Sequence, residues 1–357
     1  MKLLATIGTL SAGGAERVLS ILSKSFADEF EEVHYVIWHN MPVFYELDPR
    51  VHLHILDKSP NISRRYRDIL PFRKLVKQLK PDIVLSFLTP YNMLACIACI
   101  GVKVKLIVAE RNDPMYLKGG KLMRCARDFL YMRADRLLAQ TEYSKSCYSG
   151  RLNRICTIIP NPVIMNPKYV GSALDAGKEN KIISVGRLDP QKDQATLITA
   201  FSLFLNKHPD WTLEIYGEGP LRQDLESQVL RLSLEGKVLL PGTSNHIWDC
   251  IKSARIFVLS SIAEGMSNAL IEAMCLGLPV ISTNVAGSGD LIKDGGNGFI
   301  VGIGDYEAMA IKMSLLADNP QLASNMGELA STIYEKLNMN IISQRWIQYL
   351  HSLTVNP

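Results

Sequence analysis

Short, unbroken apolar runs alternate with helical patterns along the whole chain, and they recur about every 20 to 30 residues. Strands that are apolar on both faces are typical of parallel sheets covered by helices on both sides. We therefore predict an α/β protein. The predicted strands are 3–7, 33–38, 51–56, 83–88, 104–109, 136–139 and 156–159 in the first half, and 181–185, 212–216, 238–240, 256–259, 280–282 and 298–301 in the second.

The chain has 357 residues, which favours two domains over one. A stretch rich in Pro, Gly, Ser and Ala follows residue 160, and this composition is typical of a linker between domains. Near the end, 309–337 and 341–353 have helical patterns. We expect a first domain over 1–163, a linker over 164–178, a second domain over 179–338 and a final segment over 339–357.

The segment 261–280 joins the end of a predicted strand to a helix. Ser267 or Asn268 suits the start of this helix, and Gly277, with a proline two residues later, suits its end. Glu264 precedes the helix, and Glu272 lies four residues past Asn268 on the same face. Two carboxylates therefore flank the positive end of a helix dipole.

That arrangement suits a ligand that is anionic in the middle and carries hydroxyls at both ends, as a sugar nucleotide does. The alternative is a capped surface helix that carries two unrelated glutamates. The surrounding residues favour the ligand site. Glu264-Gly-Met-Ser-Asn-Ala-Leu-Ile-Glu272, followed by Gly277-Leu-Pro-Val, resembles the Glu-x7-Glu signature of the family 4 retaining glycosyltransferases.

This resemblance implies the GT-B fold, which consists of two Rossmann-like parallel-sheet domains that face each other across a cleft. The first would be the acceptor side and the second would bind the nucleotide sugar, with the final helix crossing back to the first. The resemblance also implies that Glu264 is the catalytic residue, steadying the transferred sugar, and that Glu272 holds the ribose hydroxyls. The donor contacts implied between them are Gly265, Met266, Ser267 and Asn268.

Two loops carry candidate phosphate contacts. Gly13 and Gly14 lie between a strand and a helix start, where glycine allows backbone N–H groups to approach a phosphate; the alternative is a tight packing turn. Arg187 and Lys192 follow the strand 181–185 and are suited to clamp a diphosphate, although a surface ion-pair loop has the same composition. Both loops resemble diphosphate-binding segments of the family.

Three further glycines, Gly217, Gly219 and Gly242, lie in turns after strands and resemble family positions that line the nucleotide cleft. Arg111 and Asn112 follow the strand 104–109 and resemble the acceptor-side segment. Many members carry a histidine close to the place that Arg111 occupies, so we expect Arg111 to contact phosphate instead. Glu110 or Asp113 would orient an acceptor hydroxyl, unless the segment is a salt-bridged loop.

Residues 58–80 hold eight basic residues and one acid among apolar positions. Such a basic amphipathic stretch suits an anionic membrane surface or the pyrophosphate of a lipid-linked acceptor. An ordinary solvated helix is the alternative. Nucleic acid is not expected as a partner, because the net charge is only +4 and no recognition motif is present.

We expect no metal and no cofactor, because the chain lacks an Asp-x-Asp pair and its histidines lack metal-ligand spacing. The seven cysteines are scattered through apolar segments, as in a reduced protein. No apolar run reaches the roughly 18 residues of a membrane span, and the first residues do not resemble a signal peptide. These features favour a cytoplasmic protein, peripheral on the inner face of the cytoplasmic membrane.

The sequence thus predicts a retaining, metal-independent glycosyltransferase of the bacterial lipid-linked oligosaccharide or surface polysaccharide type. The expected donor is a UDP-hexose or UDP-N-acetylhexosamine, and the expected acceptor is a glycan on polyprenyl pyrophosphate. The alternatives are a sugar-nucleotide epimerase of the same fold, or a non-catalytic sugar-nucleotide- or phospholipid-binding partner protein. A dinucleotide oxidoreductase is disfavoured because its glycine fingerprint is absent.

Overall fold

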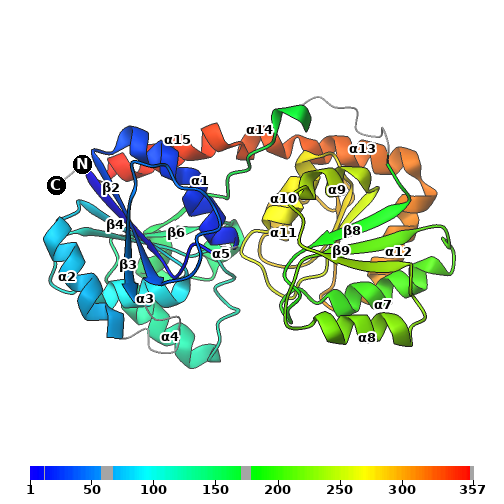
Figure 1. Cartoon of the computed structure of the whole chain (residues 1–357), viewed down its shortest axis with the longest axis horizontal. Helices are drawn as coiled ribbons and strands as arrows, with labels where there is room; N and C mark the ends of the chain where they lie inside the picture. The colour runs from blue at the N-terminus through cyan, green and yellow to red at the C-terminus, as the bar shows by residue number, and fades with distance from the viewer. Residues whose placement is uncertain (12, 58–66, 170–177, 354–357) are drawn as a thin grey trace. The chain divides into compact units, whose positions relative to one another are not determined.

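The computed structural model describes residues 1–11, 13–57, 67–169 and 178–353. It divides into two compact units, and Figure 1 colours the chain from blue to red. Unit 1 comprises Met1–Pro162 and Met339–Pro357, and unit 2 comprises Val163–Asn338. Residues 170–177, most of the predicted linker, lie outside the described residues.

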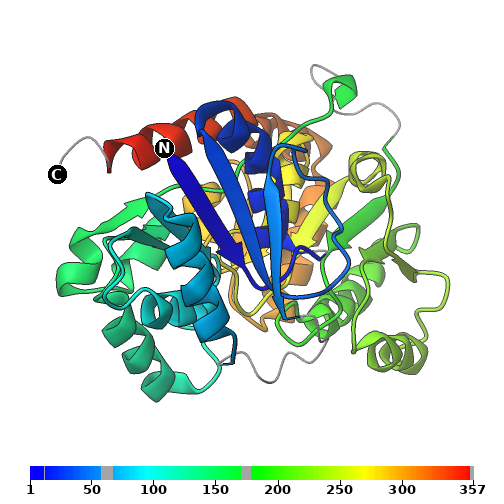
Figure 2. The ribbon, with the colours of Figure 1, turned by 60° about the vertical axis from the view of Figure 1, so that its left-hand side comes forward.

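Unit 1 contains a sheet of seven parallel strands in the order β3-β2-β1-β4-β5-β6-β7, which confirms the predicted parallel sheet. Figure 2 shows β1, β2 and β3 side by side in blue. The predicted strand 83–88 ends one residue early, because Leu88 has a φ of +72° and turns the chain into the next helix. The strands are β1 Lys2–Ile7, β2 Glu32–His39, β3 His52–Asp57, β4 Ile83–Phe87, β5 Lys105–Ala109, β6 Arg136–Ala139 and β7 Cys156–Ile158.

Helices cover this sheet, and the final helix of the chain is one of them. Trp346 of α15 packs against Phe26 and Phe87 inside unit 1. Arg345 Nη2 donates to the backbone oxygen of Ile158 at 3.0 Å. The helices are α1 Gly14–Glu29, α2 Ile69–Leu79, α3 Thr89–Ala98, α4 Gly120–Tyr131, α5 Glu142–Ser146, α6 Gly150–Arg154 and α15 Met339–Ser352.

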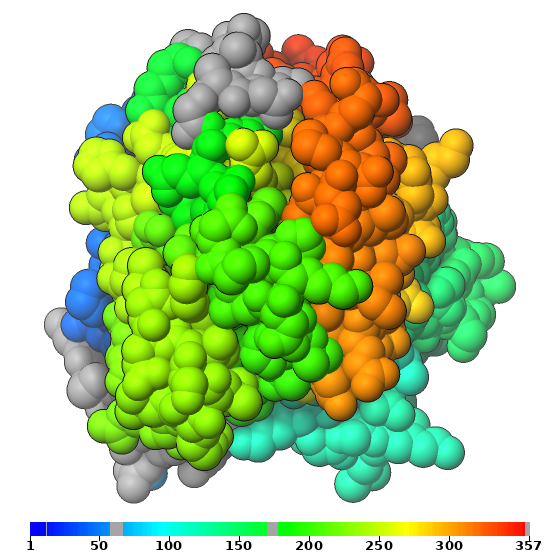
Figure 3. All heavy atoms as spheres, turned by 90° about the vertical axis from the view of Figure 1, so that its right-hand side faces the viewer, coloured from blue at the N-terminus to red at the C-terminus, as the bar shows by residue number. Residues whose placement is uncertain are grey.

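Unit 2 contains a sheet of six parallel strands in the order β10-β9-β8-β11-β12-β13, again as predicted. Its core is formed by the inner faces of the strands and of the helices that cover them. Figure 3 shows one face of this unit, where residues of α7 and α8 in green and of α12 in orange lie at the surface. The strands are β8 Lys181–Val185, β9 Thr212–Tyr216, β10 Val238–Gly242, β11 Ile256–Leu259, β12 Val280–Thr283 and β13 Phe299–Val301.

The helical pattern predicted over 309–337 is three helices rather than one. Pro320 begins the second of them, because proline lacks an N–H group and disfavours helical backbone at the residue before it. A short 3₁₀ helix, Pro167–Tyr169, precedes the first strand of the unit. The α-helices are α7 Gln194–Leu205, α8 Arg222–Arg231, α9 Ile247–Ser253, α10 Asn268–Cys275, α11 Ser288–Leu291, α12 Tyr306–Asp318, α13 Pro320–Ser331 and α14 Ile333–Leu337.

Both sheets reverse their strand order in the middle. The reversal lies between β1 and β4 in unit 1 and between β8 and β11 in unit 2. Open α/β sheets bind ligands outside the carboxyl ends of the strands at such a switch point. No helix among the residues described is both long and apolar enough to cross a bilayer.

Candidate functional site

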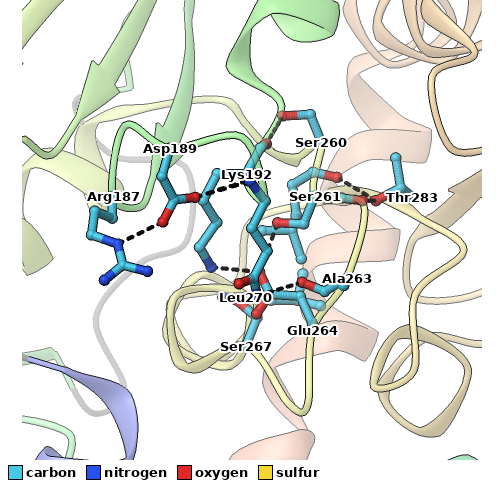
Figure 4. A network of polar contacts seen from close by, with 12 residues as sticks. Arg187, Asp189, Lys192, Ser260, Ser261, Ala263, Glu264, Ser267, Leu270 and Thr283 are labelled. Carbon is cyan, nitrogen blue, oxygen red and sulfur yellow. Dashed lines mark hydrogen bonds and ion pairs between the residues drawn. The ribbon is translucent and has the colours of Figure 1, made fainter. Parts of the chain in front are cut away.

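The switch point of unit 2 brings together the loops that follow β8 and β11 (Figure 4). Lys192 comes from the first loop and Glu264 from the second, and their Nζ and Oε1 atoms lie 2.5 Å apart. Glu264 is buried, whereas Lys192 is partly exposed. The structure therefore joins a predicted diphosphate contact directly to the predicted catalytic carboxylate.

Hydroxyl groups hold Glu264 in place. Ser261 Oγ donates to Glu264 Oε1 at 2.6 Å. The backbone oxygen of Ser261 in turn accepts from Thr283 Oγ1, on β12, at 2.5 Å. Neither Ser261 nor Thr283 was among the predicted site residues, since serine and threonine next to strands carry no signal of their own.

Lys192 is positioned by the backbone of its loop. Ser260 Oγ donates to the backbone oxygen of Lys192 at 2.8 Å. Gln191 Nε2 donates to the backbone oxygen of Ala263, also at 2.8 Å. These bonds connect the two loops, so that the ion pair rests on a fixed backbone.

Asp189 organises the Arg187–Lys192 loop. Its Oδ2 atom accepts from Arg187 Nε at 2.6 Å, and its Oδ1 atom accepts the Lys192 backbone N–H at 3.3 Å. The Arg187 side chain is 71% exposed, so its guanidinium reaches solvent beyond this bond. Asp189 was not among the predicted site residues.

Helix α10 begins as the sequence predicts. Ser267 is its N-cap and accepts from the Leu270 N–H at 3.4 Å, while Gly277 beyond its end has a φ of +72°. Glu272 is buried on this helix. The preceding loop is tightly packed, because a Cβ atom on Gly287 would lie 2.8 Å from the backbone oxygen of Gly265.

Packing between neighbouring loops accounts for two of the predicted glycines. A Cβ atom on Gly217 would lie 2.0 Å from the backbone oxygen of Gly186, and one on Gly219 would lie 2.2 Å from that of Leu188. Gly242 has a φ of +86°, which glycine tolerates best. These residues shape the carboxyl edge of the sheet even without a ligand.

In unit 1, Gly13 is the N-cap residue of α1, which Gly14 begins. A Cβ atom on Gly13 would lie 2.2 Å from Glu16 Oε2, so the Glu16 carboxylate lies against the helix start. Carboxylates and phosphates are both favoured at such a position. The structure therefore places an anion where the sequence predicts a diphosphate contact.

Arg111 lies inside unit 1 and not on the surface of a salt-bridged loop. Its Cζ atom is 5.0 Å from the ring centroids of Phe87 and Trp346. Nη1 donates to Asn161 Oδ1 at 3.3 Å, whereas Nε and Nη2 have no hydrogen-bond partner among the described residues. Burial lowers the pKa of Arg111 to about 9. Direct contact with an acceptor phosphate would require this side chain to become accessible.

The neighbours of Arg111 differ from one another in exposure. Glu110 is buried and accepts from Thr89 Oγ1 at 2.6 Å and from Tyr131 OH at 3.1 Å. Burial raises the pKa of Glu110, although these hydrogen bonds oppose the shift. Asn112 is exposed, and Asp113 Oδ1 accepts from the Met115 N–H at 2.8 Å in a local turn. The exposed positions are thus better placed for an acceptor than Glu110.

Residues 58–66 of the predicted basic stretch lie outside the described residues. The described part forms α2, whose Phe72 and Val76 are buried in the core. Arg73 Nη1 donates to the backbone oxygens of Ala98 and Ile100, at 2.6 and 2.5 Å, and so caps α3. The apolar side of α2 therefore faces the protein, as in the alternative of an ordinary solvated helix packed on the sheet.

One group among the described residues has metal-ligand distances, and the sequence analysis did not predict it. Ligand atoms of His39, Asp57 and Asp68 all lie within 4.8 Å of one another in unit 1. Burial raises the pKa of Asp68, and the nearby Asp57 carboxylate adds to the shift. In unit 2, Arg187 and Lys192 are the basic side chains of the loop that follows β8.

Two sequence profiles together cover most of the chain. Glycosyltransferase Family 4 matches residues 12–166, and Glycosyl transferases group 1 matches residues 167–332. The chain is 30% identical over 98% of its length to the GalNAc-alpha-(1->4)-GalNAc-alpha-(1->3)-diNAcBac-PP-undecaprenol alpha-1,4-N-acetyl-D-galactosaminyltransferase of Campylobacter jejuni, and covers 98% of that protein.

A second Campylobacter jejuni relative is the N-acetylgalactosamine-N,N'-diacetylbacillosaminyl-diphospho-undecaprenol 4-alpha-N-acetylgalactosaminyltransferase, which is 29% identical over 96% of this chain and 98% of its own. Among solved structures, HepE from Anabaena in complex with UDP has a TM-score of 0.81 at 18% identity, with 99% of this chain and 100% of that chain covered. This likeness confirms the GT-B fold class.

Proposed function

The chain belongs to glycosyltransferase family 4, and on this premise we propose that it is a retaining enzyme that moves a hexose or N-acetylhexosamine from a UDP-sugar to a glycan on polyprenyl pyrophosphate. Both Campylobacter relatives are named as alpha-N-acetylgalactosaminyltransferases that act on glycans linked to undecaprenol by a pyrophosphate. HepE, which shares the fold, was crystallised with UDP.

The observation that carries the proposal is the contact between Lys192 and Glu264 at the switch point of unit 2. A sugar nucleotide has a phosphate and sugar hydroxyls on either side of one anomeric carbon. The Lys192 ammonium attracts the phosphate, and the neighbouring Glu264 carboxylate accepts hydrogen bonds from the sugar hydroxyls. The pair therefore matches the part of the donor where phosphate and sugar meet. Donor binding would thus exchange the ion pair for two contacts to the ligand.

We assign the following roles to the donor side. Arg187 and Lys192, with the start of α10, neutralise the diphosphate as it leaves. Glu264 accepts from hydroxyls of the transferred sugar and stabilises the positive charge that develops at the anomeric carbon. Glu272 holds the ribose hydroxyls. The attacking hydroxyl approaches from the same face as the leaving diphosphate, which retains the alpha configuration.

The acceptor roles follow the exposure of the side chains. Asn112 and Asp113 lie at the carboxyl end of β5 and are accessible to an acceptor, whereas Glu110 is buried. Gly13 and Gly14 are proposed to meet the donor diphosphate, in the position that Glu16 now occupies. The cations at the diphosphate make a metal unnecessary, so transfer should persist in EDTA.

Two substitutions separate the roles of the glutamates. Glu264→Gln should lower transfer by about 100-fold or more without weakening UDP, because Glu264 is proposed to contact the sugar and not the nucleotide, and because loss of its charge frees Lys192 for the diphosphate. Glu272→Gln should weaken UDP by about tenfold. Isothermal titration with UDP, and transfer from UDP-N-acetylgalactosamine to a polyprenyl-pyrophosphate glycan, measure the two effects.

Glu226→Gln on the exposed face of α8 is the matched control and should behave as the wild type. If Glu272→Gln binds UDP as tightly as the wild type, the donor assignment is wrong. Consumption of donor without any acceptor would favour an epimerase. The anomeric configuration of the product, measured by NMR, tests retention directly.

A further inference from the structure

Helix α4 presents an apolar stripe to solvent. Leu122 and Phe129 are 82% and 77% exposed, the highest values for large apolar side chains in the described part of the chain. Cys125 and Ala126 between them are also exposed, as is Met132 just past the helix. Residues spaced by three, four and seven positions lie on one helical face, so these side chains form one stripe.

The opposite face of α4 is anchored by polar side chains. Arg127 is buried; its Nη1 atom donates to the backbone oxygen of Pro114 at 2.6 Å, and its Cζ atom lies 5.0 Å from the Tyr148 ring centroid. Tyr131 is buried and donates to Glu110. Figure 1 shows α4 next to α3 at the edge of unit 1. The helix is therefore held without using its apolar stripe.

Basic residues border the stripe. The segment 115–133 contains five basic residues and one acid, and that acid, Asp128, is paired with the buried Arg127. Lys118, Lys121 and Arg133 are exposed around the stripe. Met115 and Tyr116, in the loop before the helix, are exposed as well.

We propose that this outward face of α4, with residues 115–133, rests on an anionic phospholipid bilayer. Apolar side chains enter the interface between headgroups and acyl chains while lysine and arginine contact the anionic headgroups. Tyr116 suits the same boundary, because its ring is apolar and its hydroxyl is polar. The inference rests on the proposed function, because a polyprenyl-linked acceptor is itself embedded in a bilayer.

The positive charge around the apolar stripe argues against the alternative that a second copy of this chain binds to this face of α4. A two-fold contact would place the basic border of one copy against that of the other, and like charges across an interface are unfavourable.

The described part of the basic stretch, helix α2, does not offer a comparable apolar surface to a bilayer. Its apolar side is buried, and Leu70 is its exposed large apolar side chain.

The test is flotation of the full chain with vesicles of equal parts phosphatidylcholine and phosphatidylglycerol. The wild type should float, and Leu122→Ser/Phe129→Ser should bind at least about tenfold more weakly, since two large apolar side chains no longer enter the interface. Lys121→Glu/Arg133→Glu, which leaves the stripe intact, should also lose binding. Leu230→Ser/Ile311→Ser is the matched control, because both side chains are exposed on helices of unit 2, and it should float like the wild type.

Circular dichroism establishes that each variant is folded. Equal flotation of Leu122→Ser/Phe129→Ser and the wild type overturns the proposal, and so does a wild type that does not float. Light scattering that shows a dimer, converted to a monomer by the same variant without any vesicle binding, overturns it in favour of a second copy.

A water-soluble, short-chain acceptor separates this inference from the function. Leu122→Ser/Phe129→Ser should transfer sugar to it as the wild type does, and fail only with the acceptor in vesicles. A wild type that floats but transfers no sugar to either acceptor contradicts the proposed function and leaves the membrane surface standing.

Discussion

Asp189 accepts from Arg187 Nε at 2.6 Å and, through its other carboxylate oxygen, accepts the backbone N–H of Lys192 at 3.3 Å. One side chain thus fixes both of the cations that are proposed to meet the donor diphosphate. The Gln191 N–H is bound by the same oxygen at 3.1 Å. Asp189 is therefore a positioning residue for the loop.

Removing the Asp189 side chain should loosen this loop. We expect Asp189→Ala to weaken UDP binding by about tenfold, the size of one charge-assisted hydrogen bond. Asp189→Asn keeps an acceptor oxygen for the backbone and should retain most of the affinity. Titration calorimetry measures both, with Asp224→Ala on the exposed face of α8 as control. Tighter binding by Asp189→Ala would mean that its charge repels the diphosphate more than its bonds order the loop.

Gly217 should be intolerant of any side chain. Its φ is +140°, and a Cβ atom would lie 2.0 Å from the backbone oxygen of Gly186, so Gly217→Ala must push two site loops apart. We expect lower stability and a clear loss of UDP affinity. Gly236→Ala is the control: its φ is +74° with nothing within 4 Å of the Cβ position, so only the backbone penalty of about 1 kcal/mol applies. Unfolding in urea and UDP titration should separate the two variants, and equal UDP affinity in both would contradict the packing argument.

Arg111 should be replaceable without loss of stability. Its Nε and Nη2 atoms have no hydrogen-bond partner in the described part of the chain and cost about 1–3 kcal/mol each, whereas each of its two cation–π contacts returns about 0.5–2 kcal/mol. Arg111→Met keeps the apolar stack on Phe87 and Trp346 and removes the charge. We expect the melting temperature to stay constant or rise while transfer to the acceptor falls. A lower melting temperature with full activity would show instead that the stack stabilises the fold and has no part in transfer.

Histidines on β2 and β3 should make the protein less stable in acid. Burial lowers the pKa of His34, and His34 Nδ1 lies 3.1 Å from His54 Nε2, a ring whose pKa burial also lowers. The folded state therefore binds fewer protons than the unfolded state. The stability that comes from keeping these two histidines neutral is fully present above about pH 6.5, the pKa of histidine in the unfolded chain. It is lost as the pH falls below that value.

His34→Gln should flatten this dependence, since glutamine does not titrate. Thermal unfolding between pH 5 and 8, about the range over which histidine titrates, measures the slope. The control is His246→Gln at an exposed position, which should keep the slope of the wild type. A His34→Gln slope as steep as that of the wild type would place the acid sensitivity elsewhere.

The strands, both parallel sheets and helix α10 could be predicted from the amino-acid sequence alone. These follow from local signals: apolar runs, Ser267 at a helix start and Gly277 in the left-handed conformation past its end. The motif that joins Glu264 to Glu272 was also visible, because its residues share one short segment. The pattern over 309–337 concealed two breaks, and the one at Pro320 also has a local cause.

Which side chains meet, and which helix faces are covered, depends on packing between elements that are far apart in the sequence. Lys192 and Glu264 are 72 residues apart in the sequence, and their contact exists because β8 and β11 are neighbours in the sheet. Apolar periodicity identifies the face of a helix but not whether other elements cover it. The sequence pattern therefore does not show that α2 buries its apolar side, that α4 exposes Leu122 and Phe129, or that Arg111 lies among aromatic rings.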